Sequence, residues 1–324
     1  MLPVLLSICV SEAHPKFGWQ QCTRSGCSTV QGFLVHDRHY AGIWDREKRP
    51  VLDYPKDVGA TATGGTLSQR LVSKMADGTN VIGSRLYIVA SDDKNYEMFT
   101  LVGKEFTYTV DLSEIPCGVN AALYTVEMPK GGKAPGYVDY GYGYCDANCV
   151  DGGCCPEFDI QEASSKGMVF TSHTCERSNG GCDSGGCGYN PYRDSNDHAF
   201  WGTTIDVKKP VTVVTQFIGS GSQLTEVRRL YVQNGKVIKA AQSLTDTFCH
   251  YGPTDSHRLA NMGASFARGH VVVFSLWDSN GMGWMDGGNA RPCTSYDTGT
   301  IEKTSPNLKV TWSNVKYGDL DSTY

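Results

Sequence analysis

Three carboxylates fall within six residues in the run Glu157-Phe158-Asp159-Ile160-Gln161-Glu162, which otherwise reads as a strand. Acids that lie close together repel one another and are costly to bury, so such a cluster suits a site that needs one carboxyl charged and another protonated. Retaining glycoside hydrolysis has this requirement, with a nucleophile and a general acid/base about 5 to 5.5 Å apart. We therefore interpret the run as a candidate catalytic site.

The spacing of these acids sets a geometric condition. Side chains alternate between the faces of a regular strand, so Glu157 and Asp159 share one face, whereas Glu162, five positions after Glu157, falls on the other. All three converge only if a bend or β-bulge intervenes, and bulges are common beside active sites. Without one, the run is an acidic sheet edge with Glu162 in solvent.

The segments that must position this run are mostly strands. Glu105–Leu112 alternates polar and apolar residues, as a strand with one face on a core does. Other runs share its β-rich character: Arg85–Ala90, Ala121–Met128, Val211–Ile218, His270–Trp277 and Leu308–Val315.

Local signals also predict a hairpin and a helix. Asn234-Gly235 favours a type I′ turn between strands at Thr225–Gln233 and Lys236–Ala240. Apolar residues recur at helical intervals in Ser256–Arg268, and Gly269 follows them. Many strands with few short helices predict an all-β fold, an antiparallel sandwich. Because no linker rich in Pro, Ser or Thr and no internal repeat is present, we expect no second module.

Composition narrows the choice of partner. The chain has 324 residues, 37 of them glycine, and a formal charge of -5 without basic clusters. Nucleic acid and anionic membranes are therefore disfavoured, and a neutral partner is expected. Residues 1–11 are apolar but too short to span a bilayer, and we interpret them as a secretory signal peptide that lacks the positive residues usual before the apolar stretch. No later apolar run approaches about 18 residues, so no membrane anchor is expected.

Cysteine usage agrees with export. Of 13 cysteines, Cys9 lies in the predicted signal peptide, which leaves an even number that could form six disulfides. Zinc is the competing interpretation, but the cysteine spacings do not repeat a C-x2-C pattern. His36 and His39 could also suggest a metal, although a surface or cleft-lining role is more common for such a pair. We expect neither a metal nor a cofactor.

Beyond these patterns, the chain resembles glycoside hydrolase family 7, the secreted cellulases, from Glu12 to its end. The resemblance is carried in one order by Asn80–Tyr87, Leu112–Tyr124, Gly143–Asp146, Asn190–Arg193, Val213–Phe217, Arg229–Gly235 and Ser275–Asp278. It implies a concanavalin A-like jelly-roll sandwich of two antiparallel sheets, with a long cleft for a β-1,4-glucan. It also implies that residues 12–324 form a single catalytic domain without a carbohydrate-binding module.

The resemblance assigns roles to individual residues. It implies that Glu157 is the nucleophile, Asp159 a supporting aspartate and Glu162 the acid/base. The positions that it implies for substrate binding are Tyr124, Tyr144, Asp146, His173, Arg177, Arg193, Trp277, Trp284 and Arg291. Trp277 and Trp284 would be flat platforms for sugar rings. Trp19 and Trp312 are expected to pack in the core.

The resemblance also orders the cysteines. It pairs Cys22 with Cys27, Cys117 with Cys293, Cys145 with Cys155, Cys149 with Cys154, Cys175 with Cys182, and Cys187 with Cys249. Two of these bridges would grip the segment just before Glu157 and limit the motion of the nucleophile.

Several departures from the family pattern have consequences. The family usually has tryptophan at the position of Gln161 and asparagine at that of Ser164, which predicts an altered wall behind the catalytic pair. The segment Val35–Tyr40 lacks the tryptophans that the family places at the far end of the cleft. Only four residues separate Cys149 from Cys154, too few for a tunnel roof. We therefore expect an open cleft and internal cutting.

Three hypotheses remain at this point. The first is a secreted, extracellular, monomeric, retaining endo-β-1,4-glucanase. The second is a family 16 type β-1,3- or mixed-linkage glucanase, which resembles it in carrying an E-x-D-x-x-E pattern. The third is a glucan-binding protein with a decayed site, suggested by Gln161 and the missing platforms.

Overall fold

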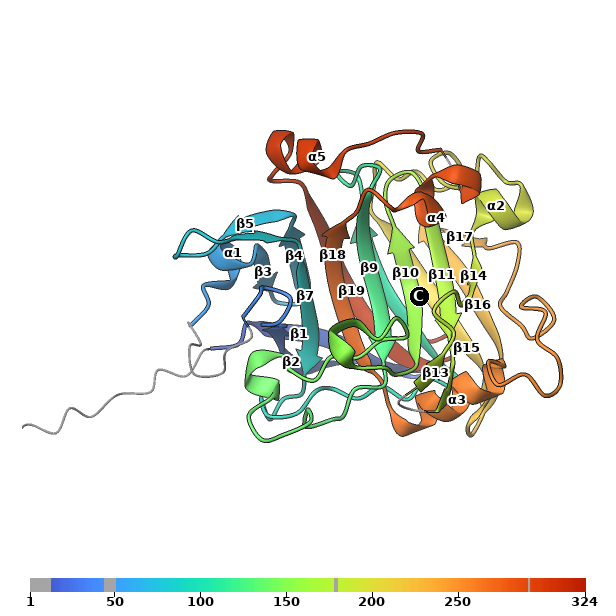
Figure 1. Cartoon of the computed structure of the whole chain (residues 1–324). Coiled ribbons are helices and arrows are strands. Elements are labelled where there is room, and N and C mark those ends of the chain that lie inside the picture. The colour runs from blue at the N-terminus through green and yellow to red at the C-terminus, as the bar shows by residue number, and fades with distance from the viewer. Residues whose placement is uncertain (1–12, 44–50, 178–179, 291) are drawn as a thin grey trace, which may run out of the picture.

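The computed structural model describes residues 13–43, 51–177, 180–290 and 292–324. The predicted signal peptide, Trp44 and Arg291 lie outside the described residues. Within them the predicted antiparallel sandwich is confirmed: strands form two layers, with helices at their margins (Figure 1). None of the helices in these ranges combines the length and apolar character needed to cross a bilayer.

The layer that carries the acidic run has seven strands. In hydrogen-bonded order they are β14 (Cys187–Tyr189), β11 (Met168–His173), β10 (Glu157–Ala163), β9 (Val119–Val126), β18 (Val271–Asp278), β7 (Ser84–Val89) and β2 (Gly26–His36). β9 is buried along its whole length, because the core covers one of its faces and surface loops cover the other. Its two neighbours, β10 and β18, are held in place on either side.

The hydrogen-bonded ladder continues into the second layer without a break. Its order is β1 (Lys16–Thr23), β19 (Lys309–Asp319), β8 (Lys104–Asp111), β15 (Val211–Ser220), β16 (Gln223–Gln233) and β17 (Lys236–Lys239). β1 joins the layers, since it pairs antiparallel with β2 and parallel with β19. The other pairings between the strands described are antiparallel: β3 (Ala60–Thr63) with β4 (Thr66–Arg70), β4 with β19, β5 (Val72–Lys74) with β6 (Asn80–Ile82), and β12 (Cys175–Arg177) with β13 (Gly180–Cys182).

The helices are short, as expected. They are α1 (Tyr54–Asp57), α2 (Pro191–Ser195), α3 (Leu259–Arg268), α4 (Gly283–Asp286) and α5 (Thr298–Thr304), with the 3-10 turns η1 (Val138–Tyr140), η2 (Val150–Gly152) and η3 (Gly288–Ala290). α3 begins three residues later than predicted. Its first N–H groups have no side-chain cap from Arg258, and Asp246 instead accepts from the Leu259 N–H at 2.9 Å, a long-range contact that local sequence does not signal.

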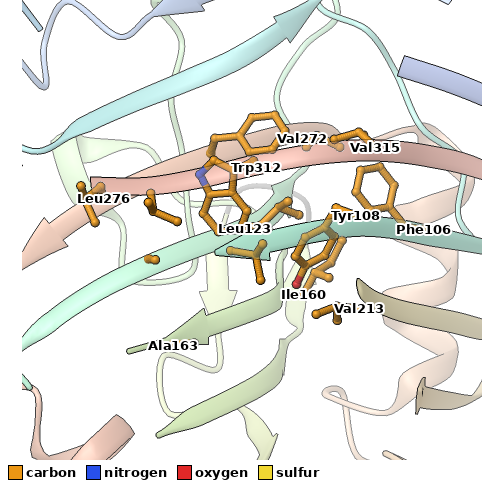
Figure 2. Packing of buried hydrophobic residues seen from close by; sticks show 14 of the residues in the cluster. Phe106, Tyr108, Leu123, Ile160, Ala163, Val213, Val272, Leu276, Trp312 and Val315 are labelled. Carbon is orange, nitrogen blue, oxygen red and sulfur yellow. The ribbon is translucent and has the colours of Figure 1, made fainter. Parts of the chain in front are cut away.

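The core lies between the two layers (Figure 2). Phe158 on β10 meets Phe217 on β15 with ring centroids 5.3 Å apart, and Phe274 on β18 meets Trp312 on β19 at 5.7 Å. Burial of Trp19 and Trp312 confirms their predicted packing role. The Asn234-Gly235 hairpin is also confirmed, with φ values of 53° and 72° at its two turn residues. The strand that carries the acidic run, β10, therefore has a packed apolar layer behind it.

The six disulfides join the pairs that the family resemblance implied. Cys117–Cys293 spans 176 residues, whereas Cys149–Cys154 closes a loop of sequence separation 5. Zinc does not fit these cysteines. Among the described residues, one group has metal-ligand spacing, Asp286 with Cys117 and Cys293, and its two sulfurs are bonded to each other.

The polar face of β8 is buried at one end, against the simple alternation expected there. Glu105 is fully buried and accepts five hydrogen bonds: from the backbone N–H groups of Asp321, Ser322 and Thr323, the Thr323 hydroxyl and the Gln216 amide. These contacts lie between 2.7 and 2.9 Å. The carboxylate of Glu105 thus holds residues 321–323 against the second layer, which contains β8.

Replacing Glu105 with glutamine should lower the free energy of unfolding by about 3 kcal/mol. The NH2 group of the glutamine would face N–H and O–H donors that need an acceptor, so those hydrogen bonds would be lost. Guanidinium denaturation measures this loss. Glu114→Gln, at an exposed glutamate, is the matched control and should change stability by less than about 0.5 kcal/mol. Equal midpoints for the two variants would contradict the role assigned to Glu105.

Candidate active site

A cleft of about 1280 Å³ lies over the outer face of the layer that contains β10. Glu157, Asp159 and Glu162 all line it, together with residues from β9, β11, β18 and the connecting loops. The cleft also receives polar and aromatic side chains, which suits a neutral, hydroxyl-rich ligand. The structure thus brings the three predicted acids into one cavity.

A β-bulge in β10 meets the geometric condition that the sequence set. Asp159 pairs with Tyr124 on β9 and Gln161 with the next residue, Leu123, so Ile160 is an extra residue with no partner in that register. The pairing with β11 shifts at the same place. Ile160 packs in the core and Gln161 bonds the core residue Tyr108, so two successive side chains face inward. Glu162 is thereby returned to the cleft face.

The carboxylate of Glu157 is buried at the floor of the cleft. Its Oε2 accepts a hydrogen bond from the Ala147 N–H at 3.0 Å. Ala147 belongs to a loop that the Cys145–Cys155 and Cys149–Cys154 disulfides tie to the start of β10. This N–H donor and the two bridges fix the position of the Glu157 side chain.

Two tyrosines and an arginine stand beside Glu157. The hydroxyls of Tyr124 and Tyr144 are 2.9 Å apart, and the Arg85 guanidinium lies 3.3 Å from the centre of the Tyr144 ring. Arg85 is held in turn by Asp37, whose Oδ2 is 2.7 Å from its Nη2. The ring positions at this wall of the cleft are therefore set by a buried ion pair.

His173 and Asp159 form an ion pair between Glu157 and Glu162. His173 Nε2 lies 3.0 Å from Asp159 Oδ2, and its Nδ1 lies 2.8 Å from the Asp183 carbonyl oxygen. A carbonyl oxygen can only accept a hydrogen bond, so Nδ1 carries a proton and donates it to Asp183. Burial alone would lower the pKa of His173, but the hydrogen bond and charge of Asp159, with the charge of Glu157, raise it to about 10.

The glutamates both hold protons more tightly than in water. Burial, followed by the charge of Asp159, raises the pKa of Glu162 to about 8, against the opposing effects of His173 and of the Asn120 amide, which donates to Glu162 Oε1 at 2.9 Å. The same two causes raise the pKa of Glu157 well above its usual value. A pKa of about 8 means that Glu162 still holds its proton at neutral pH, as a general acid must. Double-displacement chemistry requires this state.

Known proteins similar in sequence show which family this chain belongs to. The family model of glycosyl hydrolase family 7 matches residues 48–151 and 150–324. This chain belongs to glycosyl hydrolase family 7. It is 37% identical over 394 residues to the probable endo-beta-1,4-glucanase celB of Aspergillus terreus, across 97% of this chain and 93% of that protein.

Solved structures agree with this family assignment. The Humicola insolens endocellulase EGI superposes with a TM-score of 0.85 at 31% identity, over 97% of this chain and 98% of that one. A family 7 cellobiohydrolase from Daphnia pulex superposes with a TM-score of 0.86 at 27% identity, over 98% and 99% of the two chains. The jelly-roll fold implied by the family resemblance is confirmed, and this chain is a glycoside hydrolase of the cellulase type.

Most of the predicted substrate-binding residues line the cleft of this family 7 enzyme. They are Tyr124, Tyr144, Asp146, His173, Arg193, Trp277 and Trp284. The Arg193 guanidinium is anchored by Asp194 and the Gly188 carbonyl, and 43% of Trp284 is exposed, which leaves its ring accessible to a ligand. Arg291 lies outside the described residues.

Arg177 does not reach the cleft. It is an exposed residue at the end of β12, in the short hairpin that the Cys175–Cys182 disulfide closes. Its guanidinium extends over Gly180 on the partner strand β13. Arg177 is therefore not among the residues that line the cleft, and its substrate-binding role stays a prediction.

The two departures at Gln161 and Ser164 lie behind the cleft surface. Gln161 faces the core, where its Oε1 accepts from Tyr108 at 3.0 Å and its amide donates to the Ala121 carbonyl at 3.3 Å. Ser164 is buried and donates to Asp286 Oδ2 at 2.9 Å. Both polar groups are satisfied within the protein, and neither side chain lines the cleft.

Sequence reasoning missed several cleft residues. Asn120 holds Glu162, and Asp183 fixes the proton arrangement of His173, yet neither was singled out. A signal existed for Asn120, a lone polar residue in the otherwise apolar start of β9. Asp183 had none, because it acts through its backbone carbonyl. His36 is fully buried and His39 stacks on Tyr142 at 4.3 Å, which fits packing roles better than metal binding.

Proposed function

We propose that this family 7 enzyme is a retaining endo-β-1,4-glucanase that hydrolyses cellulose or related β-glucans. The observation that carries the proposal is the convergence of Glu157, Asp159 and Glu162 on one face of β10 inside the cleft. The curated relatives named endo-beta-1,4-glucanase supply the substrate class.

The proposed reaction proceeds by two displacements at the anomeric carbon. Glu157 attacks that carbon from the floor of the cleft while Glu162 gives its proton to the departing glycosidic oxygen, so a C–O bond to Glu157 replaces the glycosidic bond. Glu162, now a carboxylate, then takes a proton from water. The resulting hydroxide oxygen displaces Glu157 and restores both carboxyl groups to their starting states.

The neighbouring groups support these two roles. The His173 imidazolium balances the charge of Asp159, which lies between the two glutamates in sequence and on the same face. The Ala147 N–H stabilises the Glu157 carboxylate both before attack and when it leaves. Trp277 and Trp284 would hold the sugar rings nearest to the point of cleavage through their flat faces.

Activity should fall as pH rises through about 8, the pKa to which burial and Asp159 raise Glu162. Above that pH Glu162 loses the proton that the leaving oxygen needs. The test is kcat/KM against pH on a soluble cello-oligosaccharide. Glu162→Ala, assayed on an aryl cellobioside with a good leaving group, should lose this alkaline limb. An unchanged alkaline limb in that variant would assign it to another group.

The mode of attack is proposed to be internal cutting in an open cleft. η2 occupies the short loop between Cys149 and Cys154 and adds little over the cavity. The structural neighbours include both an endocellulase and a cellobiohydrolase, so the fold itself is compatible with either mode. The short loop and the endo-acting relatives favour the first.

The viscosity of carboxymethyl cellulose should drop steeply while few reducing ends appear, because internal cuts shorten chains faster than end cuts do. Release of cellobiose from chain ends with little change in viscosity would contradict the open-cleft proposal. Parallel assays on laminarin and xylan test the linkage. Activity on laminarin alone would favour a β-1,3-glucanase, and binding without any hydrolysis would favour a decayed site.

We further propose that the enzyme is secreted, acts as a monomer and forms one catalytic domain over residues 12–324. Six disulfides support export to an oxidising compartment. The continuous ladder through both layers supports a single domain, since the acidic run and the core behind it draw on strands from residue 16 to residue 319.

A further inference from the structure

Arg229 on β16 is a buried cation directly behind the catalytic strand. It is 2% exposed, and its Nη2 donates to the carbonyl oxygen of Ile160, the extra residue of the β10 bulge. Its guanidinium carbon lies 4.3 Å from the centre of the Phe170 ring on β11. The side chain therefore crosses from the second layer to the underside of the layer that lines the cleft.

Stability does not explain a charge at this place. Within the described residues Arg229 has no carboxylate partner in salt-bridge range, and its Nε and Nη1 make no hydrogen bond. Burying a cation with so few partners is costly, and an apolar side chain of similar volume commonly stabilises a core more. The hydrogen bond from its Nη2 therefore ties the guanidinium to the bulge.

That bulge decides which way Glu162 points. In a regular strand Glu162 would face the core, and the extra residue Ile160 turns it to the cleft instead. A bulge also leaves a peptide group outside the regular ladder, and a buried carbonyl without a partner destabilises the arrangement. Arg229 supplies the donor for that carbonyl.

We propose that Arg229 is a positioning residue for the acid/base: by binding the Ile160 carbonyl it holds the bulge and thereby aims Glu162 at the glycosidic oxygen. This inference rests on the acid/base role proposed for Glu162. Without Arg229 the β10 peptide can relax toward regular pairing, which draws the Glu162 carboxyl away from the cleft. The loss is therefore specific to proton donation.

The experiment compares aryl β-cellobiosides whose leaving groups differ in basicity. In Arg229→Met, kcat/KM should fall about 100-fold on substrates with poor leaving groups, the scale of a misplaced catalytic group, and less than about 5-fold on the dinitrophenyl glycoside, which needs little protonation. The dependence of rate on leaving-group basicity thus becomes steeper than in the unmodified enzyme. Arg228→Met is the matched control, because Arg228 is the adjacent, exposed residue that pairs with Glu226; it should change both rates less than 2-fold.

Glu162→Ala in the same series separates this inference from the proposed function. If Glu162→Ala shows the steep dependence and folded Arg229→Met does not, the positioning role is overturned while the acid/base role stands. If Glu162→Ala itself shows none, the acid/base assignment fails. If Arg229→Met does not fold, Arg229→Lys replaces it, because lysine keeps the positive charge but lacks the planar guanidinium. The dependence of its rate on leaving-group basicity should then be intermediate between those of the unmodified enzyme and Glu162→Ala. A dependence equal to that of the unmodified enzyme overturns the proposal.

Discussion

Glu157→Gln should abolish turnover, with kcat reduced by at least about 10⁴-fold, because the amide cannot form the glycosyl-enzyme bond. The fold should survive the change. Burial raises the folded-state pKa of Glu157 above its unfolded value, so this carboxyl destabilises the folded protein at neutral pH, where the unfolded chain carries it ionised. A neutral amide removes that penalty. The melting temperature should therefore equal or exceed that of the unmodified enzyme.

The stereochemistry of the first product tests the same role in the unmodified enzyme. Two displacements retain configuration, so proton NMR of a fresh digest should show the β-anomer before mutarotation mixes the signals. Glu176→Gln is a suitable control variant, because Glu176 is exposed on β12 and should leave the rate unchanged. An α-anomer as first product, or a substantial rate in Glu157→Gln, would remove Glu157 from the nucleophile role.

Glu162→Ala should lose about 10² to 10⁴ of the rate on natural glucans, which is the usual contribution of general acid/base catalysis. An aryl cellobioside with a good leaving group should still form the covalent intermediate, since its departure needs little protonation. Added azide should then accelerate turnover by attacking the anomeric carbon and displacing Glu157, and it would yield a β-glycosyl azide.

Two further measurements test the acid/base role of Glu162. Without azide, hydrolysis of the intermediate should be slow, because water lacks a base to take its proton. Asn120→Ala removes the amide that bonds Glu162 and should have a smaller effect in the same direction. Equal losses on both kinds of substrate, with no response to azide, would contradict the acid/base role of Glu162.

Much of the fold was predictable because its signals are local. The strand predicted over Glu105–Leu112 and the Asn234-Gly235 turn each depend on a few adjacent residues, and the structure has both, as β8 and as the hairpin of β16 and β17. Burial of Glu105 was not predictable in this way, because the groups that it binds lie more than 100 residues further along the chain. The parallel pairing of β1 with β19 has the same origin, since no local pattern specifies a partner so distant.

The residues of the candidate site also divide into those that local sequence shows and those that only the fold brings together. The acidic run displayed Glu157, Asp159 and Glu162 directly, and the need for a bulge followed from their spacing alone. What sustains the bulge could not be inferred, because Arg229 arrives from the opposite layer. Family resemblance supplied the disulfide pairs and most of the residues that line the cleft, whereas Arg177 lies outside that lining, in a short hairpin.

The Cys117–Cys293 disulfide has a consequence for how the enzyme withstands proteases. It closes a covalent ring that contains β9 through α4, and therefore the whole acidic run together with Trp277 and Trp284. A single peptide cut anywhere inside that ring leaves the two fragments joined through the bridge, with the ladder hydrogen bonds still in place. A molecule that a secreted protease has cut once inside this ring thus remains a single covalently linked molecule. Electrophoresis should show the two fragments only after the disulfides are reduced.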